Sequence, residues 1–141
     1  MARVSTYLNF PGKAEEAFTF YAQVFGTEVS MLQRFSDMAI PGGPQLSEEE
    51  QSLILHAEVG TLGGHLLMAT DILPSMGQEF RVGNNVTLNL EPDTKEDADR
   101  LYAALAQGGS DSTGMSQMPW GAYWGCTLDR FGVRWMLNVA Q

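Results

Sequence analysis

The stretch YLNFPGKAEEAFTFY, residues 7–21, decides the fold of this chain because a related stretch, TLNLEPDTKEDADRLY, follows at residues 87–102. Each stretch reads as a short strand of alternating residues, then a proline, a polar helix start and apolar residues at helical spacing. An internal repeat of this kind predicts two modules of one design. Their helices should lie near residues 13–25 and 95–107, each followed by a glycine that ends it.

Three strand-like segments follow each predicted helix. They are residues 27–35, 52–59 and 64–70 in the first half, and residues 112–118, 122–128 and 132–139 in the second. A long Pro/Gly-rich loop, residues 36–51, interrupts the first set, and such a loop is typical of a lid, a binding loop or a mobile segment. The pattern predicts an α+β fold of two βαβββ modules, about 1–72 and 82–141, in one domain spanning 1–141.

Composition narrows the function classes. A chain of 141 residues can bury a real core, but its net charge of −9 would repel nucleic acid and anionic lipid, so neither partner is expected. No apolar run approaches the roughly 20 residues that span a bilayer, and no basic, apolar leader opens the chain, so a cytoplasmic location is expected. The single cysteine, Cys126, excludes an internal disulfide and a cysteine-cluster metal site, and it is expected to be a buried, inert thiol.

The doubled βαβββ layout, with AEEAFTFYAQVFG at 14–26 and DRFGVRWMLN at 129–138, resembles the vicinal oxygen chelate superfamily of glyoxalase, bleomycin resistance and extradiol dioxygenase proteins. The resemblance covers nearly the whole chain and is closest to the PhnB-like branch, whose members are often labelled demethylubiquinone methyltransferase-like. It implies a cup-like curved sheet of the glyoxalase/bleomycin resistance type, half from each module. No Gly-rich loop follows a strand and opens a helix, so no nucleotide-type cofactor is expected.

The same resemblance bears on metal binding. Metal enzymes of this superfamily typically place a His on the first strand and a Glu on the last strand of each module. Those places fall on Ser5, Met68, Asn85 and Met136. Hydroxyl, thioether and amide groups are poor ligands for the divalent metals that polarise vicinal oxygens, so neither a resident metal nor metal-stabilised enediolate chemistry is expected.

Strand alternation predicts which side chains face the helices and which face the cup. The expected helix-facing residues are Leu8, Phe10, Leu53, Leu55, Ala57, Val59, Val86, Leu88, Leu90, Val133, Trp135, Leu137 and Val139. The expected cup-facing residues are Ser5, Tyr7, Asn9, Ile54, His56, Glu58, Leu66, Met68, Thr70, Asn85, Thr87, Asn89, Tyr123, Thr127, Arg134, Met136 and Asn138. Uncharged hydrogen-bonding groups mixed with Met and Tyr suit a small-molecule pocket, although an antiparallel sheet can also present a polar face to water without function.

Nine residues are candidate ligand contacts. They are Tyr7, Asn9, Met68, Asn89, Trp120, Tyr123, Arg134, Met136 and Asn138. Trp120 either covers a planar ligand at the rim of the cup or plugs the edge of the core, whereas Trp124 is expected on the helix side. Arg134 is either an anchor for an anionic ligand group, paired with Glu58 or solvated at the rim until the ligand binds, or a solvated strand-end residue near Gly132.

His56 and Glu58 share one strand face and are the candidate catalytic pair. They could act as acid and base or as two metal ligands, although two ligands alone do not hold a catalytic metal. The alternative is a hydrogen-bonded sheet histidine, at a subunit contact or elsewhere. The second histidine, His65, follows a Gly-Gly turn and is expected to be exposed and idle.

Three functions remain open at this point. The first is a PhnB-like protein that holds a small molecule in the cup without the usual metal. The second is a divergent enzyme of the lyase, isomerase or dioxygenase class, acting on a small oxygenated substrate through His56 and Glu58. The third is a structural or regulatory dimer with a vestigial cup. The resemblance also implies a homodimer, and three Trp and eight Met fit a contact surface.

Overall fold

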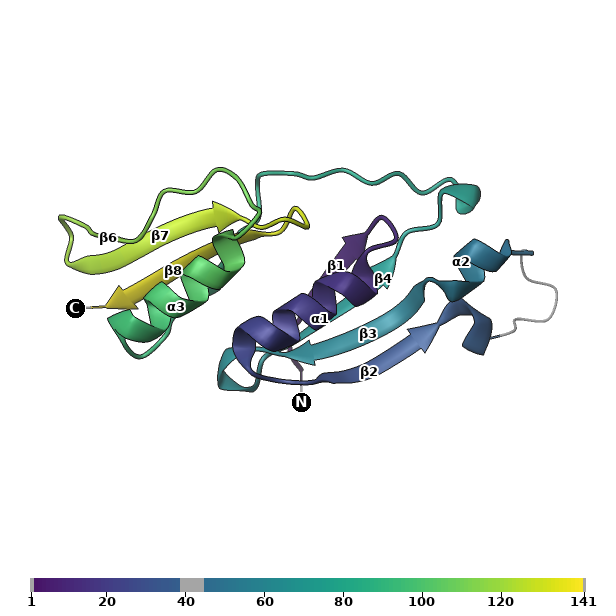
Figure 1. Cartoon of the computed structure of the whole chain (residues 1–141), viewed down its shortest axis with the longest axis horizontal. Helices are drawn as coiled ribbons and strands as arrows, with labels where there is room; N and C mark the ends of the chain where they lie inside the picture. The colour runs from purple at the N-terminus through teal and green to yellow at the C-terminus, as the bar shows by residue number, and fades with distance from the viewer. Residues whose placement is uncertain (1, 39–44, 141) are drawn as a thin grey trace. The chain divides into compact units, whose positions relative to one another are not determined.

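The computed structural model describes residues 2–38 and 45–140. The chain divides into two compact units, Met1–Arg81 and Val82–Gln141, which we call unit 1 and unit 2. Both contain a four-stranded sheet with a long helix on one face (Figure 1). That the two units form one domain spanning 1–141 stays a prediction.

The elements of unit 1 follow the order strand, helix and three strands. They are β1 (Thr6–Phe10), α1 (Ala14–Phe25), β2 (Val29–Arg34), β3 (Ile54–Gly60) and β4 (Leu66–Asp71), with the short helical turns η1 (Phe35–Asp37), α2 (Glu48–Ser52), η2 (Leu62–Gly64) and η3 (Pro74–Met76). The strand order is β1-β4-β3-β2, in which only the β1–β4 pair is parallel. The predicted apolar stripe of α1 is buried on the sheet through Ala14, Ala17, Phe18, Tyr21 and Val24.

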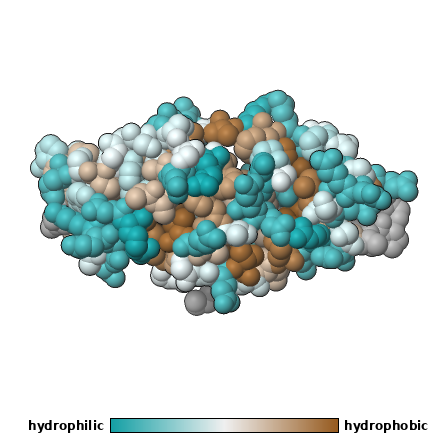
Figure 2. Space-filling view, viewed as in Figure 1, coloured by the Kyte–Doolittle hydropathy of each residue, from teal (hydrophilic) through white to brown (hydrophobic). Residues whose placement is uncertain are grey.

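Unit 2 repeats this topology. Its elements are β5 (Leu88–Leu90), α3 (Lys95–Ala106), β6 (Ser116–Gln117), β7 (Ala122–Leu128) and β8 (Arg134–Ala140), in the order β5-β8-β7-β6. Thr94 caps α3, because its hydroxyl accepts the Asp97 N–H at 3.1 Å. The outer side of α3 is charged and largely hydrophilic (Figure 2). The predicted α+β fold of two βαβββ modules is therefore confirmed.

The predicted loop 36–51 is wrong at its C-terminal end, where the acidic cluster forms the helix α2. Ser47 caps this helix by accepting the Glu50 N–H at 3.1 Å, and glutamates in a first helical turn are favoured by the helix dipole. Residues 36–37 belong to η1 instead. Residues 39–44 of the predicted loop lie outside the described residues.

The predicted phase of β3 is wrong at its start. Ile54 is buried at 1% exposure, whereas Leu53 and Leu55 are only half-buried. The cause is a β-bulge: Arg34 pairs with Ile54 while Gln33 pairs with His56, so Leu55 is an extra residue. A bulge shifts the alternation by one residue, and Ile54 therefore enters the core.

The predicted first strand of unit 2 is too long. It begins at Leu88, so Asn85, Val86 and Thr87 precede it and are exposed, Val86 to 69%. Val86 therefore does not belong to the core. Asn84 and Asn85 form a bend here, consistent with the low strand propensity of asparagine.

Two buried carboxylates, which the sequence pattern did not reveal, fasten the sheets. Asp71 accepts the N–H groups of Ala14 and Ile54, both at 2.9 Å, and so ties β4 to the starts of α1 and β3. Asp129 accepts the Phe131 N–H at 2.8 Å, the Val133 N–H at 3.0 Å and the indole N–H of Trp135 at 2.8 Å. Asp71 thereby satisfies two buried donors, and Asp129 satisfies one buried and two part-buried donors.

Candidate functional site

We call the side of each sheet opposite its own helix the open face. In unit 1 a row of side chains crosses all four strands of this face. The register places Tyr7 beside Met68, Met68 beside Glu58, and Glu58 beside Met31. Because neighbouring residues in register share a face, these four side chains point the same way, as predicted for the first three.

A hydrogen-bonded chain links three residues on this face. The Tyr7 hydroxyl lies 3.3 Å from Nδ1 of His56, and Nε2 of His56 lies 2.9 Å from a Glu58 carboxylate oxygen. The Tyr7 and His56 ring centroids are 5.7 Å apart. The His56 and Glu58 side chains are only 23% and 20% exposed, whereas Tyr7 is 48% exposed. The sequence grouped His56 with Glu58 but did not connect either residue to Tyr7.

The Glu58 carboxylate decides which atoms donate in these hydrogen bonds, because an ionised carboxylate can accept hydrogen bonds but cannot donate them. In a neutral His56, Nε2 therefore carries the proton and Nδ1 keeps a lone pair that accepts the Tyr7 hydroxyl. An imidazole held between a carboxylate and a hydroxyl is an arrangement that moves protons in enzymes. The site can therefore bind a polar group or take part in acid–base chemistry.

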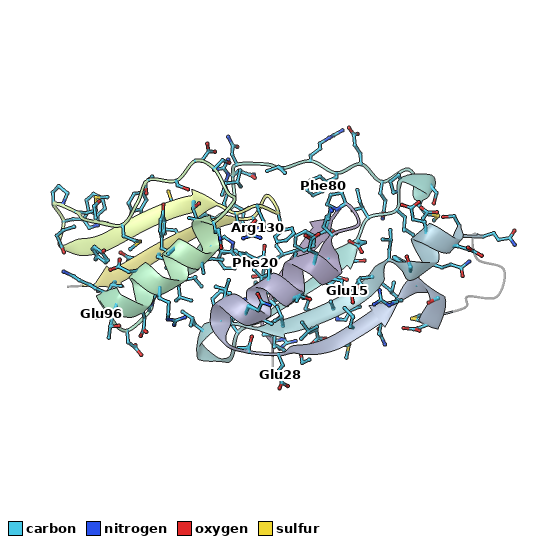
Figure 3. All side chains as sticks on the ribbon, viewed as in Figure 1. Glu15, Phe20, Glu28, Phe80, Glu96 and Arg130 are labelled. Carbon is cyan, nitrogen blue, oxygen red and sulfur yellow. The ribbon has the colours of Figure 1, made fainter. Side chains whose placement is uncertain are left out.

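Other predicted contacts of unit 1 also lie on the open face. Asn9 is exposed and pairs in register with Thr70, and Met68 is half-buried. A surface ion pair lies outside this row: Glu15 of α1, labelled in Figure 3, is 2.8 Å from the Arg34 guanidinium. The hydrogen bond that Arg34 donates to Glu15 raises the pKa of the Arg34 guanidinium, because it favours the charged form.

The open face of unit 2 holds four of the predicted contacts. Asn89 and Met136 are neighbours in register, and Asn138 lies opposite Trp124. Arg134 lies opposite Leu128 at the start of β8. Its Nε donates to the Gly83 carbonyl at 3.3 Å, and its guanidinium pairs with Asp111 at 3.4 Å. Within its own unit, Arg134 pairs with Asp111, and Glu58 likewise pairs with His56 in unit 1. The alternative that Arg134 pairs with Glu58 stays a prediction.

The predicted orientations of β7 residues are also wrong. Tyr123 and Thr127 pair in register with Val139 and Trp135, whose side chains are buried on the helix side. Tyr123 accordingly donates its hydroxyl proton to Asp99 of α3, a hydrogen bond that raises the pKa of the Tyr123 phenol. Trp124, expected on the helix side, lies on the open face instead. The prediction assigns the two faces of β7 the wrong way round because aromatic residues occupy both of them.

Trp120 and Cys126 of unit 2 are more exposed than a core position allows. Trp120 is 70% exposed at the tip of the β6–β7 hairpin, where the Gly121 N–H donates to the Met118 carbonyl at 3.0 Å. The interpretation of Trp120 as a core plug is therefore wrong. Cys126 is half-buried rather than buried, and it lies beside Met136.

The four metal-ligand positions of the superfamily do not fit a divalent metal. Ser5 and Asn85 precede the first strand of their units, and Met68 and Met136 lie on the open faces. A hydroxyl, an amide and two thioethers are a poor donor set. Within residues 2–38 and 45–140, no three His, Cys, Asp or Glu side chains cluster so as to hold a metal ion.

His65 is exposed as predicted, but it has a partner: its Nε2 lies 3.2 Å from the Thr6 hydroxyl. In the described part of the chain, no helix has both the length and the apolar character needed to cross a membrane.

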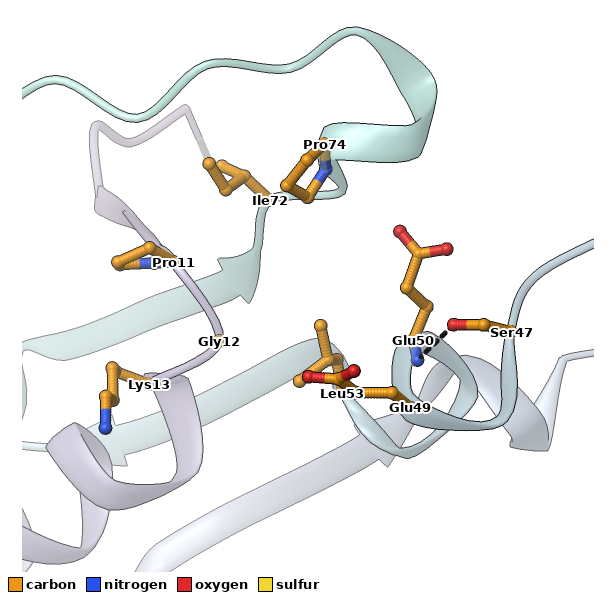
Figure 4. A pocket seen from close by; sticks show the side chains of 9 residues that line it. All are labelled: Pro11, Gly12, Lys13, Ser47, Glu49, Glu50, Leu53, Ile72 and Pro74. Carbon is orange, nitrogen blue, oxygen red and sulfur yellow. Dashed lines mark hydrogen bonds between the residues drawn. The ribbon is translucent and has the colours of Figure 1, made fainter.

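A hollow of about 560 Å³ lies in unit 1 (Figure 4). Its walls come from the β1–α1 loop, α2 and the segment after β4. The lining residues are Pro11, Gly12, Lys13, Ser47, Glu49, Glu50, Leu53, Ile72 and Pro74. None of the predicted site residues belongs to this set, and the two glutamates give the hollow an acidic wall.

Comparison with known proteins places the chain in a family. The sequence profile of the family described as 3-demethylubiquinone-9 3-methyltransferase matches residues 2–138. The chain belongs to this family. YjdN of Escherichia coli (strain K12) is 28% identical to it over 98% of the chain and 95% of that protein.

Solved structures agree with this membership. PA1353 from Pseudomonas aeruginosa superposes with a TM-score of 0.84 at 33% identity, covering 100% of this chain and 99% of the other. A putative 3-demethylubiquinone-9 3-methyltransferase, PhnB protein, from Bacillus cereus gives 0.75 at 28% identity, covering 99% and 100%. A glyoxylase/bleomycin resistance protein/dioxygenase domain from Frankia sp. EAN1pec gives 0.67 at 13% identity, covering 100% and 93%, which shows the shared fold. The predicted PhnB-like branch is confirmed.

Proposed function

We propose that this family member binds a small molecule on the open faces of its sheets without a resident divalent metal. The observation that carries the proposal is the row on unit 1, where Tyr7 and Met68 supply apolar surface beside the polar His56–Glu58 pair. Apolar surface with a few convergent polar groups is the usual composition of ligand sites.

The open face of unit 2 extends this proposal. Asn89, Met136 and Asn138 offer the same combination of amide and thioether groups, and the exposed Trp120 offers a flat apolar surface. Tyr123 is no longer part of the proposed site because it points toward α3. A homodimer and a cytoplasmic location complete the proposal, the dimer supported by the family resemblance.

Native mass spectrometry of purified protein tests these points together. We expect a dimer mass, an organic ligand retained from the expression host and no stoichiometric divalent ion, because the donor set at the four metal positions is poor. One tightly held divalent ion per chain would contradict the metal-free site. A bare monomer at micromolar concentration would contradict both the dimer and the retained ligand.

Arg134 is proposed as the anchor for an anionic ligand group. Replacing it with Met removes the charge at similar length, and we expect the affinity for the retained ligand to fall about tenfold, the value of one charge-assisted hydrogen bond. The matched control is Arg81→Met, since Arg81 is exposed and pairs with Glu79. Equal ligand occupancy in the Arg134→Met protein and the parent, measured by titration and native mass spectrometry, would exclude the anchor role.

A second candidate function is supported by the hydrogen-bonded chain. A histidine oriented by a carboxylate and bonded to a hydroxyl is the geometry of an acid–base centre. We propose as the alternative an enzyme of the lyase, isomerase or dioxygenase class that acts on a small oxygenated substrate through His56 and Glu58.

A further inference from the structure

We propose that the Tyr7 hydroxyl exchanges a proton with the ligand, that His56 holds the proton displaced from Tyr7, and that Glu58 positions His56. This inference rests on the second candidate function and deepens it. It makes Tyr7 the catalytic residue and assigns the ligand to one chemical class, neutral molecules with a weakly acidic hydroxyl such as an enol or a phenol.

The geometry gives each member of the chain a separate role. Glu58 accepts a hydrogen bond at 2.9 Å and so fixes the proton of His56 on Nε2. The Nδ1 atom then lies 3.3 Å from the Tyr7 oxygen, and its lone pair accepts the hydroxyl hydrogen of Tyr7. Hydrogen bonds of this length in unliganded sites commonly tighten when the ligand binds.

Exposure identifies the member that a ligand reaches first. Tyr7 is 48% exposed, about twice as exposed as the side chains of its two partners. It also lies on β1, which is an edge strand of the unit 1 sheet. Tyr7 is therefore the contact group, and His56 and Glu58 act behind it.

The residues beside the Tyr7–His56–Glu58 hydrogen bonds indicate the ligand class. Met68 lies next to both Tyr7 and Glu58, and a thioether adapts to the apolar body of a ligand. A carboxylate or phosphate ligand has no proton to give at neutral pH, and the Glu58 charge would repel it. The ligand therefore needs an apolar body to cover Met68 and a proton to exchange with Tyr7, without a negative charge near Glu58. A neutral molecule with an acidic hydroxyl has all of these properties.

The proposed step conserves protons and needs no co-reactant. The ligand O–H bond breaks and its proton binds the Tyr7 oxygen, while the original Tyr7 proton forms an N–H bond at Nδ1 of His56. The ligand becomes an anion, Tyr7 remains a neutral phenol and His56 becomes an imidazolium paired with the Glu58 carboxylate. The reverse transfer restores the starting state.

The test uses benzenesulfonyl fluoride, which reacts with activated phenols, on the full chain. The Tyr7 oxygen bonds to sulfur, the S–F bond breaks with release of fluoride, and His56 takes the phenol proton. Peptide mass spectrometry then measures the rate of Tyr7 labelling. We expect His56→Gln to slow labelling about tenfold or more, and Glu58→Gln to slow it by a smaller factor. His65→Gln, which removes the other histidine placed at a hydroxyl, should match the parent.

Equal labelling rates in the parent and the His56→Gln protein would overturn the proposal. Nitrogen-15 NMR of the two imidazoles provides the second measurement, with the neutral His56 proton expected on Nε2 in the parent and on a mixture of nitrogens in Glu58→Gln. A parent His56 with its proton on Nδ1 would also overturn the proposal. Neither measurement involves the ligand, so their failure is distinct from a failure of ligand retention.

Discussion

Replacing Asp129 with alanine is expected to lower the free energy of unfolding by about 4 kcal/mol, because one buried and two part-buried donors lose one shared acceptor. Asp129 is only 3% exposed and receives two backbone N–H groups and the indole N–H of Trp135. Each unsatisfied buried donor costs about 1–3 kcal/mol, and partial water entry reduces the sum. Urea unfolding followed by circular dichroism measures the effect, with the exposed Asp93→Ala as control.

A double-mutant cycle separates the indole contact from the turn contacts. Trp135→Phe removes the indole donor and leaves an aromatic ring in the core, so the combined cost of Asp129→Ala and Trp135→Phe should fall short of the sum of the single costs by about 1–2 kcal/mol. A loss below about 1 kcal/mol in Asp129→Ala would show that the carboxylate does not fasten the turn.

Repetition made the architecture predictable, whereas side-chain orientation was predictable only where alternation was unbroken. In β8 a regular run buries Trp135, Leu137 and Val139 as expected. In β3 the extra residue Leu55 reverses the phase, and a bulge depends on the partner strand, which local sequence does not specify. In β7 aromatic residues stand on both faces, so polarity alone could not orient Tyr123 and Trp124.

The candidate site was predictable in the part that lies within one strand. His56 and Glu58 are two residues apart and therefore share a face in any regular strand. Tyr7 is 49 residues from His56, and their contact depends on β4 lying between β1 and β3. That order is a property of the whole sheet, so neither periodicity nor spacing could supply it.

The buried carboxylates were missed for a related reason. Asp71 is the last residue of β4 and Asp129 directly follows β7, and an aspartate at the end of an apolar strand ordinarily indicates a solvated turn. The Asp129–Gly132 turn did contain a signal, since an aspartate commonly accepts backbone N–H groups of the residues that follow it. For Asp71 the donors come from α1 and β3, which are distant in sequence, and no local signal exists.

Replacing Asp71 with alanine is expected to lower the free energy of unfolding by about 3 kcal/mol, because the N–H groups of Ala14 and Ile54 lose their buried acceptor. Asp37→Ala is the matched control. Asp37 also accepts a backbone N–H, from Arg34 at 2.9 Å, but it is exposed, so water replaces it at a cost below about 1 kcal/mol. Urea unfolding of the two variants compares the free energy lost when a carboxylate that accepts backbone N–H groups is removed from a buried and from an exposed position.

The Asp71 variant should also disturb the candidate site. Ile54 begins β3 two residues before His56, so losing its anchor loosens the strand start that fixes the imidazole between Tyr7 and Glu58. Imidazole NMR signals of the folded variant should therefore move for His56 and stay in place for His65, which lies beyond the other end of β3. Unchanged signals from both histidines would mean that the open-face row holds its geometry without Asp71, and that the sheet pairing alone positions the site.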